Sequence, residues 1–177
     1  MQASRKGVDW TRRRLLQGNL GGPKRPPRPP WAVDESRFIE LCTRCDDCIR
    51  ACEDGLLVRG AGGYPEIRFT EYGCNFCGDC LQACRAGALN APHPAPSLAW
   101  RWRAQISDRC LSLRGIVCRS CGDACDTEAI RFRLEVGGRA TPLLDIDACN
   151  GCGECLVVCP EDAVALVEPE SAQEETA

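Results

Sequence analysis

Residues 74–84 read CNFCGDCLQAC, a run in which four cysteines are separated by two, two and three other residues. Three cysteines at two-residue intervals can curl a short loop around one cubane iron-sulfur cluster, with the intervening amides pointing at sulfur. A fourth cysteine three residues further on enters a short helix and points away from that loop, toward a neighbouring cluster. This stretch therefore predicts a ligand loop for a 4Fe-4S cluster.

The same pattern recurs along the chain as an internal repeat. All sixteen cysteines fall into four sets of four. The sets are Cys42, Cys45, Cys48 and Cys52; Cys74, Cys77, Cys80 and Cys84; Cys110, Cys118, Cys121 and Cys125; and Cys149, Cys152, Cys155 and Cys159. Only the third set departs from the spacing, with seven residues between its first two cysteines. Because no thiol is left over, the sequence predicts four 4Fe-4S clusters that use every cysteine as a ligand.

Two other classes of protein hold cysteine at a density of 16 in 177 residues. Small secreted domains pair their thiols in disulfides, which form in oxidising compartments. Zinc ribbons bind one ion between two separated C-x2-C knuckles, so four cysteines within eleven residues would leave a ligand unexplained in every set. The lone histidine, His93, lies between two prolines, and we interpret it as a solvated linker residue. Iron-sulfur ligation is therefore favoured over both alternatives.

The segments between the cysteine sets predict short strands. Residues 130–136 alternate apolar and polar side chains, and a Gly-Gly turn leads from them to a second strand at 141–144. Residues 56–58 and 64–69 flank another glycine turn, and residues 163–167 form a final strand. Each unit is expected to contain a ligand loop, a short helix that holds the fourth cysteine, and a hairpin strand. The predicted fold class is α+β, built from tandem bacterial (two-cluster) ferredoxin-like modules.

The chain is expected to divide into five segments. They are a basic, proline-rich and disordered arm over residues 1–35, a first module over 36–91, a linker over 92–107, a second module over 108–168 and an acidic tail over 169–177. The linker contains three prolines and then Trp100 and Trp102. These two rings allow two interpretations: an exposed strip that docks a partner, or a cover over the junction between the modules.

Two ligation schemes are open within each module. In the first, each set of cysteines binds its own cluster. In the second, the fourth cysteine crosses over to the neighbouring cluster, as in bacterial two-cluster ferredoxins. The crossover scheme groups Cys42, Cys45 and Cys48 with Cys84; Cys74, Cys77 and Cys80 with Cys52; Cys110, Cys118 and Cys121 with Cys159; and Cys149, Cys152 and Cys155 with Cys125.

Charge is distributed unevenly along the chain. The net charge is −3, yet residues 1–30 carry eight Lys and Arg side chains against one Asp. A basic arm on an acidic body is typical of an interaction segment, and we take Arg12, Arg13 and Arg14 as candidate partner-binding residues. Since the body is acidic and lacks a recognition motif, the expected partner is an acidic protein and not nucleic acid.

Residues 11–16, TRRRLL, are similar to a twin-arginine export motif. An export signal also needs an apolar region of about 7 to 15 residues after the arginines. Here a glycine-containing and then proline- and arginine-rich stretch follows, and no window is apolar enough for a membrane span. The expected location is therefore the cytoplasm, where thiols stay reduced and available to metal.

The sequence contains no catalytic constellation. There is no serine-centred elbow, no glycine pattern that opens a dinucleotide-binding helix, and no cysteine free of metal duty. We therefore do not expect an enzyme.

Segments outside the cysteine sets make a narrower assignment possible. The chain resembles the family of NapF ferredoxin-type proteins of the periplasmic nitrate reductase system. The resemblance covers nearly the whole chain and is carried by TRRRLL at 11–16, PPWAVDESRFIELCTRCDDC at 29–48, RGAGGYP at 59–65, CNFCGDCLQAC at 74–84, CRSCGDAC at 118–125 and CNGCGECLVVCP at 149–160.

The resemblance implies a cytoplasmic accessory protein that turns over no substrate. Such a protein binds the molybdenum- and iron-sulfur-containing catalytic subunit of periplasmic nitrate reductase before its export, and assists its maturation or cluster assembly. The alternative is an electron-transfer polyferredoxin subunit of an oxidoreductase complex. The chain departs from the ferredoxin pattern in the long interval from Cys110 to Cys118, which raises the hypothesis of a more exposed or labile cluster there.

Overall fold

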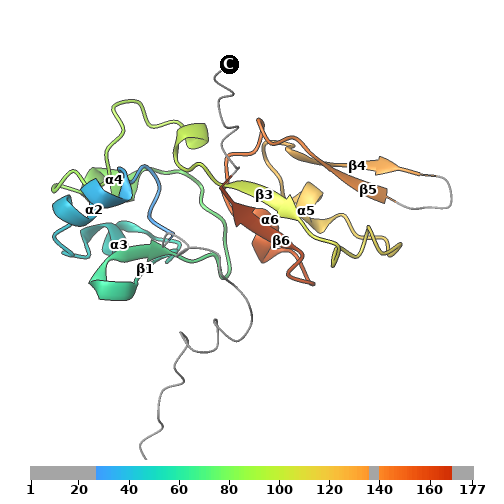
Figure 1. Cartoon of the computed structure of the whole chain (residues 1–177), viewed down its shortest axis with the longest axis horizontal. Coiled ribbons are helices and arrows are strands. Elements are labelled where there is room, and N and C mark those ends of the chain that lie inside the picture. Colours follow the sequence, from blue (N-terminus) through green and yellow to red (C-terminus); the bar gives the residue numbers. More distant parts are fainter. Residues whose placement is uncertain (1–26, 136–139, 169–177) are drawn as a thin grey trace, which may run out of the picture.

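Short helices accompany the ligand loops in both halves of the chain. The computed structural model describes residues 27–135 and 140–168. Its first half contains α2 (Glu35–Leu41), α3 (Asp47–Ala51) and α4 (Asp79–Ala83), and its second half contains α5 (Ser120–Asp123) and α6 (Glu154–Val157). Figure 1 shows the two halves side by side, with α2, α3 and α4 in one and α5 and α6 in the other.

The helices hold the third cysteine of each set. Cys48, Cys80, Cys121 and Cys155 are each the second residue of a helix. The fourth cysteine lies beyond the helix end, so the expectation that the helix would hold it is wrong. Cys52 and Cys84 are C-cap residues whose ψ angles of 98° and 81° leave the helical range. This change of direction sends the fourth sulfur toward the neighbouring set.

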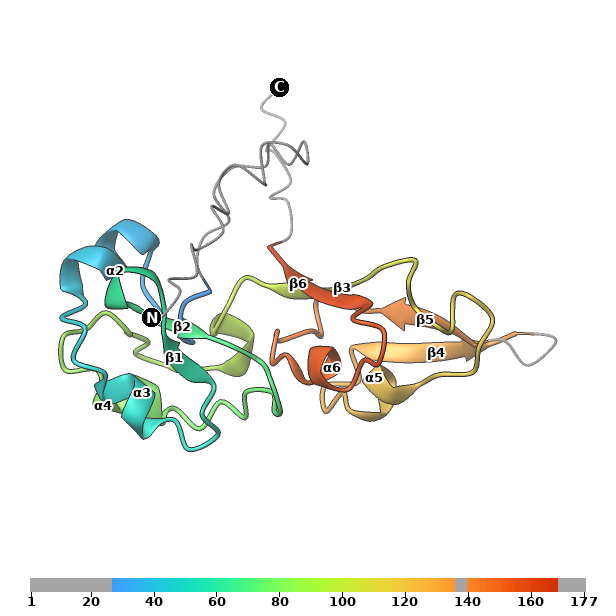
Figure 2. The same ribbon diagram turned by 90° about the horizontal axis from the view of Figure 1, so that it is seen from below.

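Three two-stranded antiparallel sheets complete the described fold. Strands β1 (Leu57–Arg59) and β2 (Pro65–Ile67) flank the 3-10 helix η1 (Ala61–Gly63), and β4 (Ile130–Leu134) pairs with β5 (Ala140–Leu144). Both predicted hairpins are thus confirmed, although the turn at Gly137 and Gly138 lies outside the described residues. Figure 2 shows β4 and β5 extending away from the first half of the chain.

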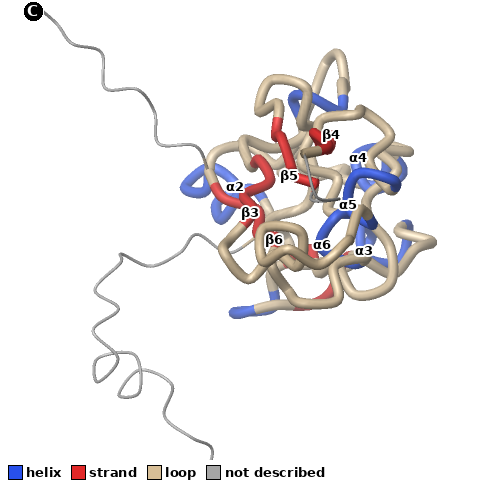
Figure 3. Tube along the Cα trace, turned by 90° about the vertical axis from the view of Figure 1, so that its right-hand side faces the viewer, coloured by secondary structure: helices blue, strands red, loops and turns tan. Residues whose placement is uncertain are grey.

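The third sheet changes the boundary expected for the linker. Strand β3 (Arg103–Ile106) pairs with β6 (Val164–Val167), the predicted final strand, with Ile106 opposite Val164. Residues 103–106 therefore belong to the second module, and the linker expected over 92–107 ends before them. The rest of the expected linker contains the 3-10 helix η2 (Pro96–Leu98). Viewed from the side of the second module, most of the described trace is loop (Figure 3).

Residues 28–35, expected in the arm, also pack into the first module. The Arg28 guanidinium lies 4.8 Å from the centroid of the Phe38 ring, and its Nη2 is 2.7 Å from Glu35 Oε1. Trp31 is 4% exposed, and its backbone N–H donates to the Ala99 carbonyl at 3.0 Å. Cation–π and hydrogen-bond contacts thus anchor this segment, so the arm is shorter than expected.

Phe38 is the largest side chain fully buried in the described core. Replacing Phe38 by Ala should lower the free energy of unfolding of the first module by about 3–5 kcal/mol, because the removed ring leaves a cavity and no longer supports Arg28. Urea unfolding followed by tryptophan fluorescence would measure the change. The control is Ile39→Ala, since Ile39 is 46% exposed. Equal unfolding midpoints for the two variants would contradict the prediction.

Candidate iron-sulfur sites

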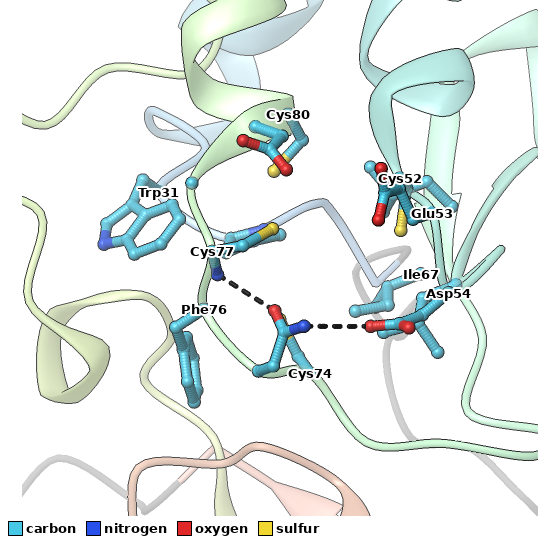
Figure 4. A pocket seen from close by; sticks show the side chains of 15 residues that line it. Trp31, Cys52, Glu53, Asp54, Ile67, Cys74, Phe76, Cys77 and Cys80 are labelled. Atoms are coloured by element: carbon cyan, nitrogen blue, oxygen red, sulfur yellow. Dashed lines mark hydrogen bonds between the residues drawn. The ribbon is translucent and has the colours of Figure 1, made fainter.

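Cysteines from different sets meet in the first module. Cys42, Cys45, Cys48 and Cys84 line one cavity, which we call site 1. Cys52, Cys74, Cys77 and Cys80 line a second, site 2. Figure 4 shows Cys52, from the end of α3, facing Cys77 and Cys80 across the cavity of site 2. The fourth cysteine of each set therefore lies with the other set, which is the crossover arrangement and not the within-set one.

The second module repeats this arrangement. Cys125, Cys149, Cys152 and Cys155 line a cavity, site 4. Cys110, Cys118 and Cys159 lie near Cys121 in the other part of the module, and we call these four cysteines site 3. All sixteen predicted site cysteines are thus gathered, four at a time, by loops and helix ends. His93 is exposed. Arg12, Arg13 and Arg14 lie outside the described residues.

The donor sets suit a cluster. Within residues 27–135 and 140–168, no three Cys, His, Asp or Glu side chains converge closely enough to hold a single metal ion. At sites 1, 2 and 4, four cysteines instead line one shared cavity. Four cysteine sulfurs around a space are the donor set that a 4Fe-4S cluster takes. The residues present therefore fit this group.

Asparagine side chains brace two of the ligand loops. The Cys77 N–H donates to Asn75 Oδ1 at 3.0 Å, and the Cys152 N–H donates to Asn150 Oδ1 at 3.1 Å. Each asparagine follows the first cysteine of its set, so both form the same local turn. In the first module Asn75 Nδ2 also donates to Asp54 Oδ2 at 3.2 Å, as Figure 4 shows. These bonds fix the first two ligands relative to each other.

Left-handed backbone shapes three of the loops. The residues on either side of the second cysteine have positive φ angles in the first, second and fourth sets: Arg44 and Asp46, Phe76 and Gly78, Gly151 and Gly153. Such left-handed residues can turn successive N–H groups toward one point, which makes a concave site for negative charge. The third set departs from this rule, in line with its different spacing.

Backbone amides already reach three of the sulfurs. The Leu89 N–H lies 3.3 Å from Cys84 Sγ and the Ala163 N–H lies 3.2 Å from Cys159 Sγ. The Ala104 N–H lies 3.5 Å from Cys149 Sγ. Hydrogen bonds to sulfur stabilise thiolate charge and tune the potential of a bound cluster. Sequence reasoning did not find these donors, because any residue except proline supplies an amide.

Several thiols are too buried to ionise by themselves. Burial, followed by repulsion from neighbouring thiolates, raises the pKa of Cys80 and of Cys155 to about 12. The same two causes raise the pKa of Cys48 and of Cys121 to about 11. In the metal-free protein these thiols therefore keep their protons at neutral pH, and a bound cluster must displace them.

Iron binding should weaken as the pH falls. A cluster needs thiolates, and the raised pKa values of Cys48, Cys80, Cys121 and Cys155 keep at least one thiol of each site protonated at neutral pH, so cluster binding releases protons. Acid favours the proton-bound, metal-free side, so the fraction of iron retained should fall steadily as the pH is lowered below the raised pKa values of about 11 to 12. Iron content after anaerobic gel filtration at each pH would test this. A retained fraction independent of pH would contradict it.

The long interval of the third set projects from the second module. Leu113, Ile116 and Val117 are 50%, 54% and 74% exposed, whereas Cys110 at its start is 8% exposed. The Ser112 hydroxyl is buried and donates to the Ala140 carbonyl, which anchors the base of the loop. The tip of the interval is thus exposed while its ligand is covered. Greater lability of site 3 stays a hypothesis.

Comparison with known proteins places the chain in a family. The 4Fe-4S dicluster domain model matches residues 41–88 and 115–163, one segment in each module. The ferredoxin-type protein NapF of Escherichia coli K12 is 43% identical over 157 residues, which cover 89% of this chain and 94% of that protein. The NapF of Haemophilus influenzae is 48% identical over 139 residues, or 78% of this chain and 77% of that protein.

The chain belongs to the NapF family of ferredoxin-type proteins. A second ferredoxin-type protein, NapG of Escherichia coli K12, is 34% identical over 157 residues, covering 78% of this chain and 68% of that protein. The two matched segments confirm the predicted α+β fold of tandem two-cluster modules. The second segment starts at residue 115, inside the long interval, so Cys110 lies outside the part of this NapF-family chain that matches the domain model.

The family assignment makes the chain an iron-sulfur protein whose relatives are named for ferredoxin-type domains and not for a catalysed reaction. The longest helix described in this NapF-family chain, α2, has seven residues. None of the helices within 27–135 and 140–168 has the length and apolar character to cross a membrane.

Proposed function

We propose that the chain is a cytoplasmic accessory protein that carries four 4Fe-4S clusters, binds the catalytic subunit of periplasmic nitrate reductase before export, and assists its maturation or cluster assembly. The observation that carries the proposal is the gathering of sixteen cysteines into four separate sets in a NapF-family chain. The chain turns over no substrate of its own in this role.

The cysteines of sites 1 to 4 are the proposed ligands, one cluster at each site. A bound cluster supplies one-electron exchange or is itself delivered as cargo. The protein's own part is to hold the thiolates around each cavity and to direct the amides of Leu89, Ala104 and Ala163 at sulfur. These amides offset part of the negative charge that the thiolates bring into partly buried loops.

Charge supports the proposed docking through the arm. Four thiolates around a 2+ core leave a charge of about −2 per oxidised cluster, so the loaded protein shifts from −3 to about −11. Seven of the eight basic side chains of residues 1–30 come before residue 27, and Arg12, Arg13 and Arg14 are adjacent among them. We propose that these three arginines contact an acidic surface of the precursor. The body of the chain is itself acidic and would repel such a surface, so the arm is needed for docking.

A pull-down of the precursor would test this function. The first variant replaces Arg12, Arg13 and Arg14 by Ala, and the matched control replaces Arg5, Lys6 and Arg25, which removes the same charge from the same arm. The parent and the control should capture the cytoplasmic precursor, and the first variant should lose it. A deletion should stop at residue 26, because Arg28 and Trp31 pack into the first module.

The same pull-down can also give a result that contradicts the maturation role. Capture of mature redox partners alone, with no precursor bound by the parent, would contradict the maturation role and favour the electron-transfer polyferredoxin. Transfer of iron and sulfide from the loaded protein to a metal-free target, with equal loss from the donor, would separately test cluster delivery. One structural feature favours the electron-transfer alternative: ligand loops of the two modules are in direct contact.

A further inference from the structure

Ligand loops of sites 2 and 4 are bonded to each other across the module junction. The N–H of Cys74, a residue of site 2, donates to the carbonyl of Cys152, a residue of site 4, at 2.7 Å. One residue earlier, the Gly73 N–H donates to Glu154 Oε2 at 2.5 Å. The partners are about 80 residues apart in sequence, so these bonds join two modules and not two turns of one loop.

Glycines allow this close approach. A Cβ on Gly73 would lie 2.4 Å from Glu154 Oε2 and 2.7 Å from the Glu154 backbone nitrogen. A Cβ on Gly153 would lie 2.5 Å from the Phe69 ring, and one on Gly151 would lie 2.9 Å from the Trp102 carbonyl oxygen. Any larger residue at Gly73 or Gly153 would push the two modules apart, and one at Gly151 would push away the Trp102 backbone beside the junction.

Aromatic rings cover the junction. Trp100 is 8% exposed and stacks on Trp102 with ring centroids 5.4 Å apart and planes 7° apart. Its ring also lies 5.5 Å from that of Phe76 and 6.2 Å from that of Phe69, both in the first module. Trp100 is therefore part of a packed cover between the modules and not of an exposed docking strip. The contact between the ligand loops is thus supported by buried apolar area.

The cysteine sets connect all four sites in one order. In the first module α3 carries Cys48 of site 1 and ends at Cys52 of site 2, and in the second module Cys125, four residues after Cys121 of site 3, lines site 4. Between the modules, the hydrogen bond from the Cys74 N–H to the Cys152 carbonyl joins site 2 to site 4. The resulting order is 1, 2, 4, 3, with sites 1 and 3 at the ends.

We propose that the junction couples sites 2 and 4, with Glu154 as the positioning residue, so that the chain holds one continuous series of four sites in place of two independent pairs. This inference rests on the proposed function, since it needs clusters at both inner sites. Reduction of one inner site by a one-electron donor then changes the magnetic and electrostatic surroundings of the other.

Substitutions at Glu154 would test the proposal in the full, loaded chain. Glu154→Ala removes the acceptor of the Gly73 N–H, whereas Glu154→Gln keeps an oxygen there. The matched control is Asp79→Ala, because Asp79 is likewise the first residue of its helix and lies beside a ligand loop of site 2. Within the described residues the Asp79 carboxylate bonds with Cys77 of its own loop and makes no hydrogen bond to the second module, so Asp79→Ala removes a carboxylate beside site 2 without altering the junction.

Two measurements are made on each variant. Hydrogen exchange of the Gly73 and Cys74 amides should be about tenfold faster in Glu154→Ala than in the parent, because a charged acceptor is lost. Spin–spin broadening in the electron paramagnetic resonance spectrum of the dithionite-reduced protein should decrease in Glu154→Ala. In Glu154→Gln, both the exchange rate and the broadening should stay close to those of the parent. In Asp79→Ala, both should equal those of the parent.

The outcomes separate the two proposals. Iron and sulfide amounting to fewer than four clusters per parent chain would contradict the proposed function, together with the coupling that depends on it. Full cluster content, with exchange and broadening in Glu154→Ala equal to those in Asp79→Ala, would overturn the coupling alone and leave the proposed function standing.

Discussion

Removal of iron from the purified protein should unfold both modules, the second more completely than the first. Six of the buried core residues are cysteines: Cys48, Cys80, Cys110, Cys121, Cys149 and Cys155. The sheets have two strands each, and an isolated two-stranded sheet is marginal in water. Clusters that tie the loops together would supply the missing core, as structural metals do in other small domains.

The expected difference between the modules follows from their cores. The first module buries Trp31, Phe38 and Trp100 together with Leu56 and Ile67. The described buried residues of the second module include no aromatic ring; its apolar side chains are small or β-branched, such as Ala129, Ile130 and Val164. The first module should therefore keep a residual apolar cluster after iron is lost, whereas the second should retain almost none.

Far-ultraviolet circular dichroism and trypsin digestion of the chelator-treated protein would measure this unfolding. Cleavage should be faster at Arg131 and Arg133, in β4, than at Arg59, in β1. Reconstitution with iron and sulfide is the control and should restore resistance at all three positions. A metal-free protein that unfolds cooperatively with the parent's transition midpoint would contradict the prediction.

Local patterns predicted the ligand loops and hairpins because short-range spacing determines both. Cysteines two residues apart lie in one loop whatever the rest of the chain does, and a glycine turn between alternating residues closes a hairpin locally. Strand β3 was missed for the opposite reason. It has four residues, and its partner β6 begins nearly 60 residues later, so the pairing is visible only in the fold.

Charge patterns misassigned the end of the arm. Arg28 closes a run of basic residues and was therefore counted with them, yet its guanidinium packs over the Phe38 and Tyr64 rings and pairs with Glu35. Long-range packing decides this role, because the aromatic rings come from separate segments. Similarly, Glu154 has the same place in its helix as Asp79, and only the approach of Gly73 distinguishes the two carboxylates.

Cys84→Ser should remove the cluster from site 1 and leave site 2 loaded. Cys84 lies at the end of α4, in the same set as the site 2 residues Cys74, Cys77 and Cys80, but it lines the cavity of site 1. If each set bound its own cluster, Cys84→Ser would instead remove the cluster held by Cys74, Cys77 and Cys80 and leave the other one in place. Iron content should fall by about a quarter in either scheme, so the identity of the released thiols decides between them.

Alkylation of the native variant followed by mass spectrometry would identify those thiols. With a cluster absent from site 1, Cys42, Cys45 and Cys48 should react with iodoacetamide, with the exposed Cys45 reacting fastest. Cluster-bound Cys74, Cys77 and Cys80 should stay protected, because iron-bound sulfur is a poor nucleophile. Cys52→Ser is the reciprocal control and should release those three instead, since Cys52 lines the cavity of site 2. Labelling of Cys74, Cys77 and Cys80 in Cys84→Ser would show that each set binds its own cluster. It would contradict the crossover arrangement, on which the proposed order of the four sites depends.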